Sequence, residues 1–161
     1  MTDVFSKAKR SDVMSRIRAQ GNKKTELAFM TLLRKNRITG WRRHLSLSLG
    51  TERETAGKIK IRSWRVKPDF VFRNLRVAIF IDGCFWHGCP RHCVQPASNP
   101  IFWREILLAN KLRDRRVSNA LRRRNWRVIR VWEHQLQQGD KLIQRLQRKI
   151  FKISSHGSCL V

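Results

Sequence analysis

A short segment of the chain, GCFWHGCPRHC, concentrates residue types that bind metals. Cys84, Cys89 and His92 have the C-x4-C-x2-H spacing of a zinc loop, and thiolates and imidazoles are the ligands that zinc prefers. The loop is too short to supply a tetrahedral set without strain, so the fourth ligand is expected from His134, beyond a later strand, or from Cys93. The sequence therefore predicts a structural zinc site. The alternative is a set of reduced cysteines beside solvent-facing histidines.

His87 lies within the same segment but out of step with the zinc spacing. A histidine that a zinc loop holds near Asp82, at the end of the apolar run VAIFID, is well placed to act as a general base. The alternative is that His87 is a further, unused zinc ligand.

Acidic residues are scarce in this chain, which has 11 Asp and Glu against 36 Lys and Arg and a net charge of +25. A carboxylate beside an apolar strand therefore needs an explanation. Asp69, in KPDFVF, could hold Mg²⁺, which takes oxygen ligands and supports phosphodiester hydrolysis. The alternative for Asp69 is a cap at the start of a strand. Residue patterns alone assign Glu26 to the dipole of a helix N-terminus and Asp114, in KLRDRR, to a solvated ion pair.

The excess of basic residues, with a sequence pI near 11.7, predicts a polyanionic partner. Nucleic acid is favoured over an anionic membrane surface, because no basic amphipathic anchor stands apart from the fold. Phe85 and Trp86 occupy a loop position that is poor for core packing, and Trp103 begins the next helix. Such aromatic side chains can enter the base stack of a duplex.

Composition also excludes several protein classes. Four cysteines in 161 residues are too few for a disulfide framework, which favours a reducing, cytoplasmic compartment. No apolar run approaches the roughly 20 residues that span a bilayer, and the N-terminus does not have the pattern of a secretory signal.

The candidate residues need a folded domain to position them, and 41% hydrophobic residues are enough for a core. One domain is expected over residues 21–153, between a basic segment 1–20 and a flexible tail 154–161. The order α-β-β-α-β-α predicts an α/β domain around a small mixed sheet flanked by helices. Segment 45–65 is interpreted as an inserted hairpin or loop. The first expected helix is capped by Thr25 and has Leu27, Met30 and Leu33 on one face; it is followed by a strand ending at Phe72, a turn at Asn74 and a strand over 76–82.

The second expected helix covers about 99–124, with Phe102, Ile106, Ala109, Leu112 and Leu121 on one face. A strand over 126–132 follows, and then a helix from Asp140 with Leu142, Leu146, Ile150 and Ile153 on one face.

The DGCFWHGCP block, with PDF upstream and WEH downstream, resembles the very-short-patch-repair (Vsr-type) mismatch endonucleases of bacteria. The similarity runs from about residue 10 to 138 and includes RSDVMSRIR, KPDFVF, NPIFW, NKLRDRRV and NWRVIRVWEHQL. The resemblance implies a restriction-endonuclease-like nuclease domain of the PD-(D/E)XK type with a structural zinc. It also implies Mg²⁺-dependent hydrolysis of one strand of duplex DNA, 5′ of the mispaired T at T:G mismatches, in DNA repair.

The resemblance also implies roles for individual residues. Asp69 and the main-chain carbonyl of Ile81 would bind Mg²⁺, and His87 would be the catalytic histidine, supported by Glu26 and Asp114. The zinc ligands would be Cys84, Cys89, His92 and His134. The residues expected to penetrate or contact DNA are Phe85, Trp86, Trp103, Arg42 and Arg43.

Three features depart from the pattern common in this family: the additional segment 45–65, Ile106 where a lysine is common, and Asp82 where some members have histidine. They keep open an endonuclease with another mismatch or sequence specificity. A non-catalytic, zinc-containing nucleic-acid-binding module is the alternative from another class. We expect a monomer in the bacterial cytoplasm, with other mismatch-repair proteins as further partners.

Overall fold

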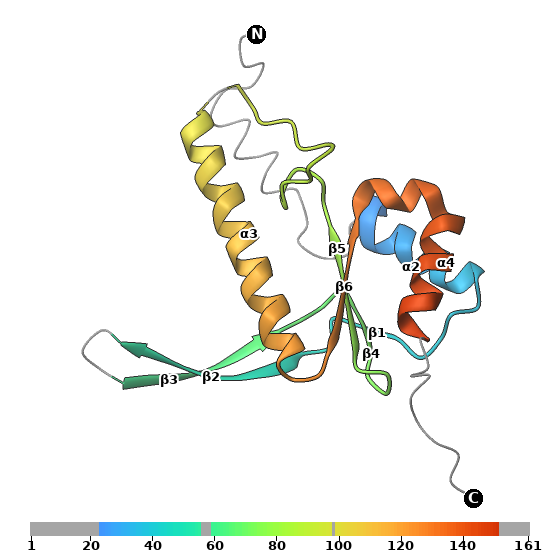
Figure 1. Ribbon diagram of the computed structural model, residues 1–161, viewed down its shortest axis with the longest axis horizontal. Helices are drawn as coiled ribbons and strands as arrows, with labels where there is room; N and C mark the ends of the chain where they lie inside the picture. The colour runs from blue at the N-terminus through green and yellow to red at the C-terminus, as the bar shows by residue number, and fades with distance from the viewer. Residues whose placement is uncertain (1–22, 56–58, 98, 152–161) are drawn as a thin grey trace, which may run out of the picture.

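A computed structural model describes residues 23–55, 59–97 and 99–151 of the chain. Its centre is a four-stranded sheet in which β5 runs parallel to β6 and the other neighbours are antiparallel (Figure 1). The predicted α/β domain with a small mixed sheet is confirmed. The strands, in their order across the sheet, are β1 (Arg42–Arg43), β4 (Phe70–Phe72), β5 (Val77–Asp82) and β6 (Arg127–Trp132).

Helices cover both faces of this sheet (Figure 1). A π-helical turn (Lys23–Leu27) leads into α2 (Ala28–Lys35), which lies beside α4 (Gly139–Ile150) on one face, while α3 (Pro100–Arg122) covers the other. None of the described helices is long and apolar enough to cross a membrane.

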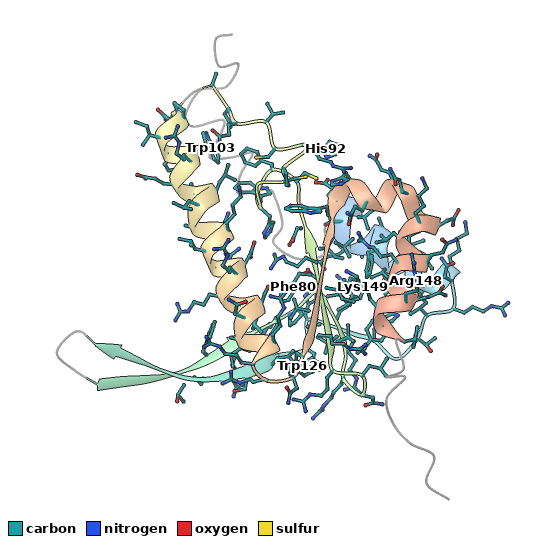
Figure 2. The ribbon with its side chains drawn as sticks, in the orientation of Figure 1. Phe80, His92, Trp103, Trp126, Arg148 and Lys149 are labelled. Atoms are coloured by element: carbon teal, nitrogen blue, oxygen red, sulfur yellow. The ribbon has the colours of Figure 1, made fainter. Side chains whose placement is uncertain are left out.

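Alternate residues of the central strands point to the two helical layers. Ile79 and Ile81 pack in the core on the α2 and α4 side, whereas Ala78 and Phe80 pack in the cluster on the α3 side. Both faces of β5 are therefore covered, which explains why its sequence is almost continuously apolar. Figure 2 shows the same division, with Phe80 on the α3 side and Arg148 on the opposite side of the molecule.

The apolar pattern predicted the buried face of α4 but not that of α3. Leu142, Leu146 and Ile150 are buried as expected, while Ile153 lies outside the described residues. In α3 the expected face is wrong in part: Leu121 is buried as predicted, but the side chains of Phe102 and Leu112 are 52% and 55% exposed. The inward stripe is instead formed by Trp103, Leu107, Asn110, Asp114, Val117 and Leu121. Asp114 and Val117 line the cleft described below, and Asn110 donates to the main chain of Trp86.

The start of the first helix also differs from the prediction. Thr25 is not an N-cap: it is buried inside the π-helical turn, and Glu26 beside it is 4% exposed. The turn therefore directs Glu26 toward the interior. In α2 the fully buried residues are Phe29 and Leu33, with Met30 half-buried against the same core.

Segment 45–65 forms the predicted hairpin. Strands β2 (Leu47–Thr55) and β3 (Ile59–Val66) pair with each other as a separate two-stranded sheet, which extends below α3 in Figure 1. The register shifts between Ser48 and Gly50, where Gly50 has φ +99°. The expected terminal segments 1–20 and 154–161 lie outside the described residues.

Candidate active site and metal centres

A cleft of about 660 Å³ opens beside the carboxyl end of β5. Ligand sites in open α/β sheets form at the carboxyl ends of parallel strands. The cleft receives side chains from the π-helical turn, from the connection between β3 and β4, from the loop after β5, and from α3, β6 and the hairpin. It brings together the four residues expected at a catalytic centre: Glu26, Asp69, His87 and Asp114.

Beside the cleft lies a cluster of Cys84, Cys89, His92 and His134, here called the Cys–His group. The Nδ1 atom of His134 lies 3.2 Å from Cys84 Sγ and 3.7 Å from Cys89 Sγ, and His92 Nδ1 lies 3.7 Å from Cys89 Sγ. In tetrahedral zinc, S and N ligands are separated by about 3.5 Å. The donor set and its spacing therefore fit zinc. Cys93 Sγ instead lies 3.6 Å from the main-chain oxygen of Phe85.

The end of β6 helps to hold the Cys–His group together. The N–H of Cys84 donates to Glu133 Oε2 at 3.3 Å, so the residue before His134 also fixes the loop. Burial, together with the electrostatic effect of the neighbouring His92 and Arg91, lowers the pKa of His134. The imidazole is therefore neutral at pH 7, as a metal ligand must be.

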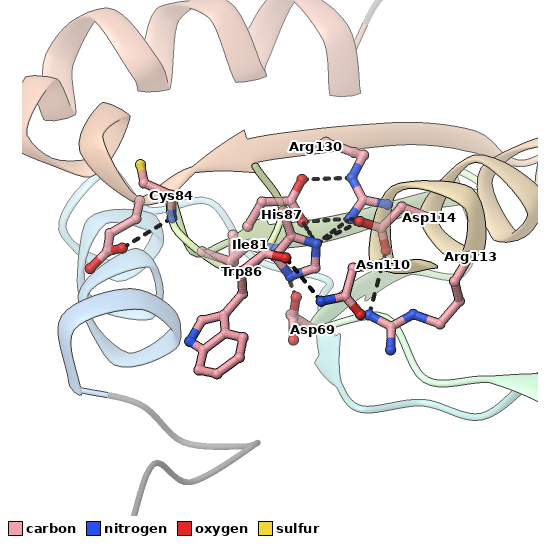
Figure 3. A network of polar contacts seen from close by, with 11 residues as sticks. Asp69, Ile81, Cys84, Trp86, His87, Asn110, Arg113, Asp114 and Arg130 are labelled. Atoms are coloured by element: carbon pink, nitrogen blue, oxygen red, sulfur yellow. Dashed lines mark hydrogen bonds and ion pairs between the residues drawn. The ribbon is translucent and has the colours of Figure 1, made fainter. Parts of the chain in front are cut away.

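On the α3 side of β5, Asp82, His87 and Asp114 form a second cluster around Arg130 (Figure 3). These four residues are here called the His87 group. His87 Nδ1 lies 2.5 Å from Asp114 Oδ2. Arg130 donates from Nε and Nη2 to the two oxygens of Asp82, at 2.6 and 2.5 Å, and its Nη2 lies 3.1 Å from Asp114 Oδ2. A guanidinium thus occupies the space between the two carboxylates.

The charges of this group determine which nitrogen of His87 is free. Burial acts to raise the pKa of Asp114, but the hydrogen bond to His87 and the charges of His87 and Arg130 outweigh it and lower the pKa. Asp114 is therefore a carboxylate, which can only accept a hydrogen bond. The Nδ1–H of His87 therefore donates to Asp114, and in a ring that carries a single proton Nε2 is the basic nitrogen.

A third cluster contains Glu26, His44 and Asp69, here called the Asp69 group. The N–H of Ile81 donates to Asp69 Oδ2 at 2.7 Å, which fixes the carboxylate against β5. Glu26 Oε2 lies 2.6 Å from Arg43 Nη2 and 3.0 Å from His44 Nε2. Arg43, which was expected to contact DNA, is therefore paired with Glu26 in this structure.

Asp69 has the electrostatics of a cation ligand. Burial, with a smaller contribution from the nearby Glu26, raises its pKa to about 6 against the lowering effect of the Ile81 N–H. The buried Glu26 and the half-buried Asp69, which a backbone donor holds, lie beside each other and offer the hard oxygen ligands that Mg²⁺ takes. The residues present therefore fit a divalent cation.

The aromatic residues expected to penetrate DNA form one packed set. Phe85 contacts Trp86 and Trp103 edge-on, with ring centroids 5.1 and 5.3 Å apart. Phe85 and Trp86 line the cleft, whereas Trp103 is buried behind them. Asn110 of α3 donates to the main-chain oxygen of Trp86 at 3.0 Å, which ties this loop to the helix that carries Asp114.

The chain matches the family described as DNA mismatch endonuclease Vsr over residues 2–95. The chain belongs to the Vsr family. The matched range contains Glu26, Asp69 and His87, and so the Vsr resemblance seen in the sequence is confirmed.

Similar Vsr-family and nicking proteins come from several bacteria. The DNA mismatch endonuclease Vsr of Escherichia coli (strain K12) is 40% identical over 59% of this chain and 62% of its own length. The type II nicking enzyme V.NaeI of Lentzea aerocolonigenes is 54% identical, over 44% of this chain and 43% of its own. The alignments thus span less than two thirds of these two relatives. The type II nicking enzyme V.XorIIP of Xanthomonas oryzae pv. oryzae is 32% identical over 91% of this chain and 96% of its own.

Two residues of this Vsr-family site were missed in the sequence. Arg130 interrupts the apolar strand RVIRVW, and a cation inside an apolar strand is as informative a signal as a carboxylate beside one. His44 follows the basic pair Arg42 and Arg43 and looked like part of a surface cluster. Nothing in its local pattern indicated that it lies beside Glu26.

Proposed function

We propose that this chain is a Mg²⁺-dependent DNA mismatch endonuclease, which hydrolyses one strand of duplex DNA 5′ of the mispaired T at T:G mismatches in very short patch repair. The observation that carries the proposal is that a Vsr-family chain places the Asp69 group and the His87 group along one cleft. One group offers oxygen ligands for a cation, and the other offers a base. Phosphodiester hydrolysis needs both.

Asp69 and Glu26, with the main-chain carbonyl of Ile81, would hold the metal. Bound Mg²⁺ would supply the positive charge that offsets the charge of the reacting phosphate. The N–H of Ile81 keeps Asp69 in place for this role.

His87 is the proposed general base. Its Nε2 would take a proton from the attacking water as the water oxygen bonds to phosphorus and the bond to the leaving oxygen breaks. Asp114 would hold Nδ1–H and stabilise the imidazolium that forms, as an orienting carboxylate does for other catalytic histidines. Arg130 acts through these groups, because it fixes Asp114 from the opposite side.

Zn²⁺ bound by the Cys–His group would have a structural role. Cys84 and Cys89 flank His87 in one loop, and His134 belongs to the end of β6. Tying these segments together would set the position of His87 relative to Asp114. The proposed DNA contacts are Phe85, Trp86, Trp103, Arg42 and Arg43.

The direct test is a nicking assay on a duplex with one T:G mismatch. We expect the purified protein to nick the strand with the mispaired T when Mg²⁺ is present and to be inactive with EDTA. Asp69→Asn should abolish nicking and retain duplex binding. Wild-type protein that binds the duplex but never nicks it would instead support a non-catalytic, zinc-containing binding module.

A second candidate keeps the nicking chemistry and changes the target. It is favoured by relatives that are named type II nicking enzymes. A panel of all mispairs, each in several flanking sequences, distinguishes the two. Fastest nicking at T:G supports the first candidate, and faster nicking at another mispair supports the second.

A further inference from the structure

The root of the β2–β3 hairpin, residues 64–67, forms one wall of the cleft. Trp64, Arg65, Val66 and Lys67 line the same space as Asp69 and His87. The hairpin is a separate sheet from the strands that carry the catalytic candidates. Its root nevertheless borders the same cleft as Asp69 and His87.

Packing fixes this root against α3. Trp64 and Val66 join the apolar cluster that contains Leu121 of the helix. The guanidinium carbon of Arg116 lies 4.9 Å from the ring centroid of Trp64. The Arg124 side chain crosses Gly50 of the partner strand, where an added Cβ would meet Nη2 at 2.5 Å. The hairpin root is therefore held by the same helix that carries Asp114.

The floor and the wall of the cleft carry opposite charges. The floor has the carboxylate of Asp69, which has no ion-pair partner among the described residues and repels phosphate unless a cation is present, whereas Glu26 and Asp114 are paired with Arg43 and Arg130. Arg65 and Lys67 are exposed, and neither has an ion-pair partner among the described residues. Unpaired cations next to an acidic floor are suited to phosphates on either side of the one that reacts.

We propose that the hairpin root is a phosphate-binding edge, in which Arg65 and Lys67 bind the DNA backbone beside the nick. This inference rests on the proposed function, since it takes duplex DNA as the occupant of the cleft. The bound chemistry is a pair of flanking phosphodiesters, so the contact adds affinity and register and carries no base specificity. It gives the hairpin, which lies outside the central sheet, a role in placing the strand over Asp69.

The test compares two double variants that each remove two positive charges. Arg65→Ala with Lys67→Ala removes the proposed contacts. Arg148→Ala with Lys149→Ala is the matched control, because both residues are exposed on α4, on the other side of the sheet (Figure 2). Binding of a mismatched duplex is measured against salt concentration, in the presence of Ca²⁺ in place of Mg²⁺ so that cleavage does not interfere.

The affinity K falls as salt rises, and each lost phosphate contact reduces the steepness of log K against log salt by about 0.9. The root variant, which loses two contacts, should therefore show a slope that is less steep by about 1.8. We expect its affinity to fall about tenfold or more, uniformly across sequences, with little change for the control. Equal slopes for the two variants would overturn the inference. So would ethylation interference that shows the same flanking phosphates for the wild-type protein and the root variant.

The outcome is separable from that of the proposed function. If the salt dependence of duplex binding is weaker for the root variant but the wild-type protein never nicks DNA, the binding edge stands and the proposed activity fails. If the wild-type protein nicks T:G duplexes and the two double variants bind alike, the activity stands and the binding edge is wrong.

Discussion

The two halves of the cleft solve the problem of buried charge in different ways. In the His87 group, Arg130 lies between Asp82 and Asp114, so that two carboxylates and two basic side chains compensate one another. In the Asp69 group, the Asp69 carboxylate is held by the Ile81 N–H, and burial raises its pKa to about 6. In the first half the carboxylate charges are compensated without a metal, whereas in the second a bound cation would compensate the charge of Asp69.

This difference assigns the chemistry. A metal in the His87 group would have to displace Arg130, whose pKa the carboxylates of Asp82 and Asp114 raise in spite of its burial. A metal in the Asp69 group would relieve the repulsion between Asp69 and Glu26. We therefore propose that the cation binds at Asp69 and that the base is the histidine held by Asp114.

The largest effect is expected from losing the Cys–His group, because it fixes the loop that carries His87. Cys84→Ser should lower the zinc content from one atom per chain and reduce nicking below detection, since structural zinc contributes directly to folding. The matched control is Cys93→Ser, whose thiol lies outside the group. Metal analysis and nicking rates measure both variants. Full zinc content in folded Cys84→Ser protein would contradict the four-ligand assignment.

Removing the proposed base should affect the rate and not the binding. His87→Ala is expected to lower the single-turnover nicking rate by about 10²- to 10⁴-fold, the range typical of general base catalysis, with an unchanged Kd for the duplex. Asp114→Asn should also lower the rate, because an amide can turn its NH₂ toward Nδ1 and favour the tautomer in which Nε2 carries the proton. Rates within twofold of the wild type for His87→Ala would remove His87 from the mechanism.

Breaking the compensated half should cost stability. Arg130→Met leaves Asp82, which is 2% exposed, without its guanidinium partner. We expect the free energy of unfolding to fall by about 3 kcal/mol, as for other ion pairs that lose one buried partner. Urea unfolding measures this change. The double variant Asp82→Asn with Arg130→Met should recover part of the loss, and a double variant as unstable as Arg130→Met would show that the pair is not the cause.

The parts of the fold and of the site that could be predicted from the sequence are those whose residues lie close together in the chain. The spacing of Cys84, Cys89 and His92 is contained in one loop, and the position of His134 after an apolar strand suggested the fourth ligand. The strand β5 was equally clear from its continuous apolar sequence. Local patterns of this kind survive folding, because the same few residues generate both the pattern and the structure.

The partners within the cleft could not be foreseen in the same way. Asp114 belongs to the inward stripe of α3, but polar residues in that stripe disrupt its apolar periodicity, and so Phe102 and Leu112 were wrongly placed inside. Arg130 meets Asp82 because β5 and β6 are parallel in one particular register, with Phe80 opposite Arg130. The sequences of the two strands alone do not determine the direction or the register of their pairing.

The smallest effect is the response of the Asp69 group to pH. Protonated Asp69 cannot bind a cation, so the apparent affinity for Mg²⁺ should fall below pH 6, approaching tenfold per pH unit. The metal-free protein should respond in the opposite direction. Because the folded pKa of about 6 exceeds the ordinary value of 3.8, Asp69 binds a proton more readily in the folded state and contributes stability as the pH falls from 6 toward 4. Unfolding curves of wild-type and Asp69→Asn protein, with and without Mg²⁺, measure both signs.

The central claim is that the divalent cation binds at Asp69 and not at the His87 group. Mn²⁺, used as a paramagnetic substitute for Mg²⁺, can be titrated into the zinc-loaded protein and followed by electron paramagnetic resonance. We expect Asp69→Asn to lose the Mn²⁺ site and Asp114→Asn to retain it, with an affinity within about threefold of the wild type. Retained binding in Asp69→Asn, together with lost binding in Asp114→Asn, would place the cation at the His87 group instead.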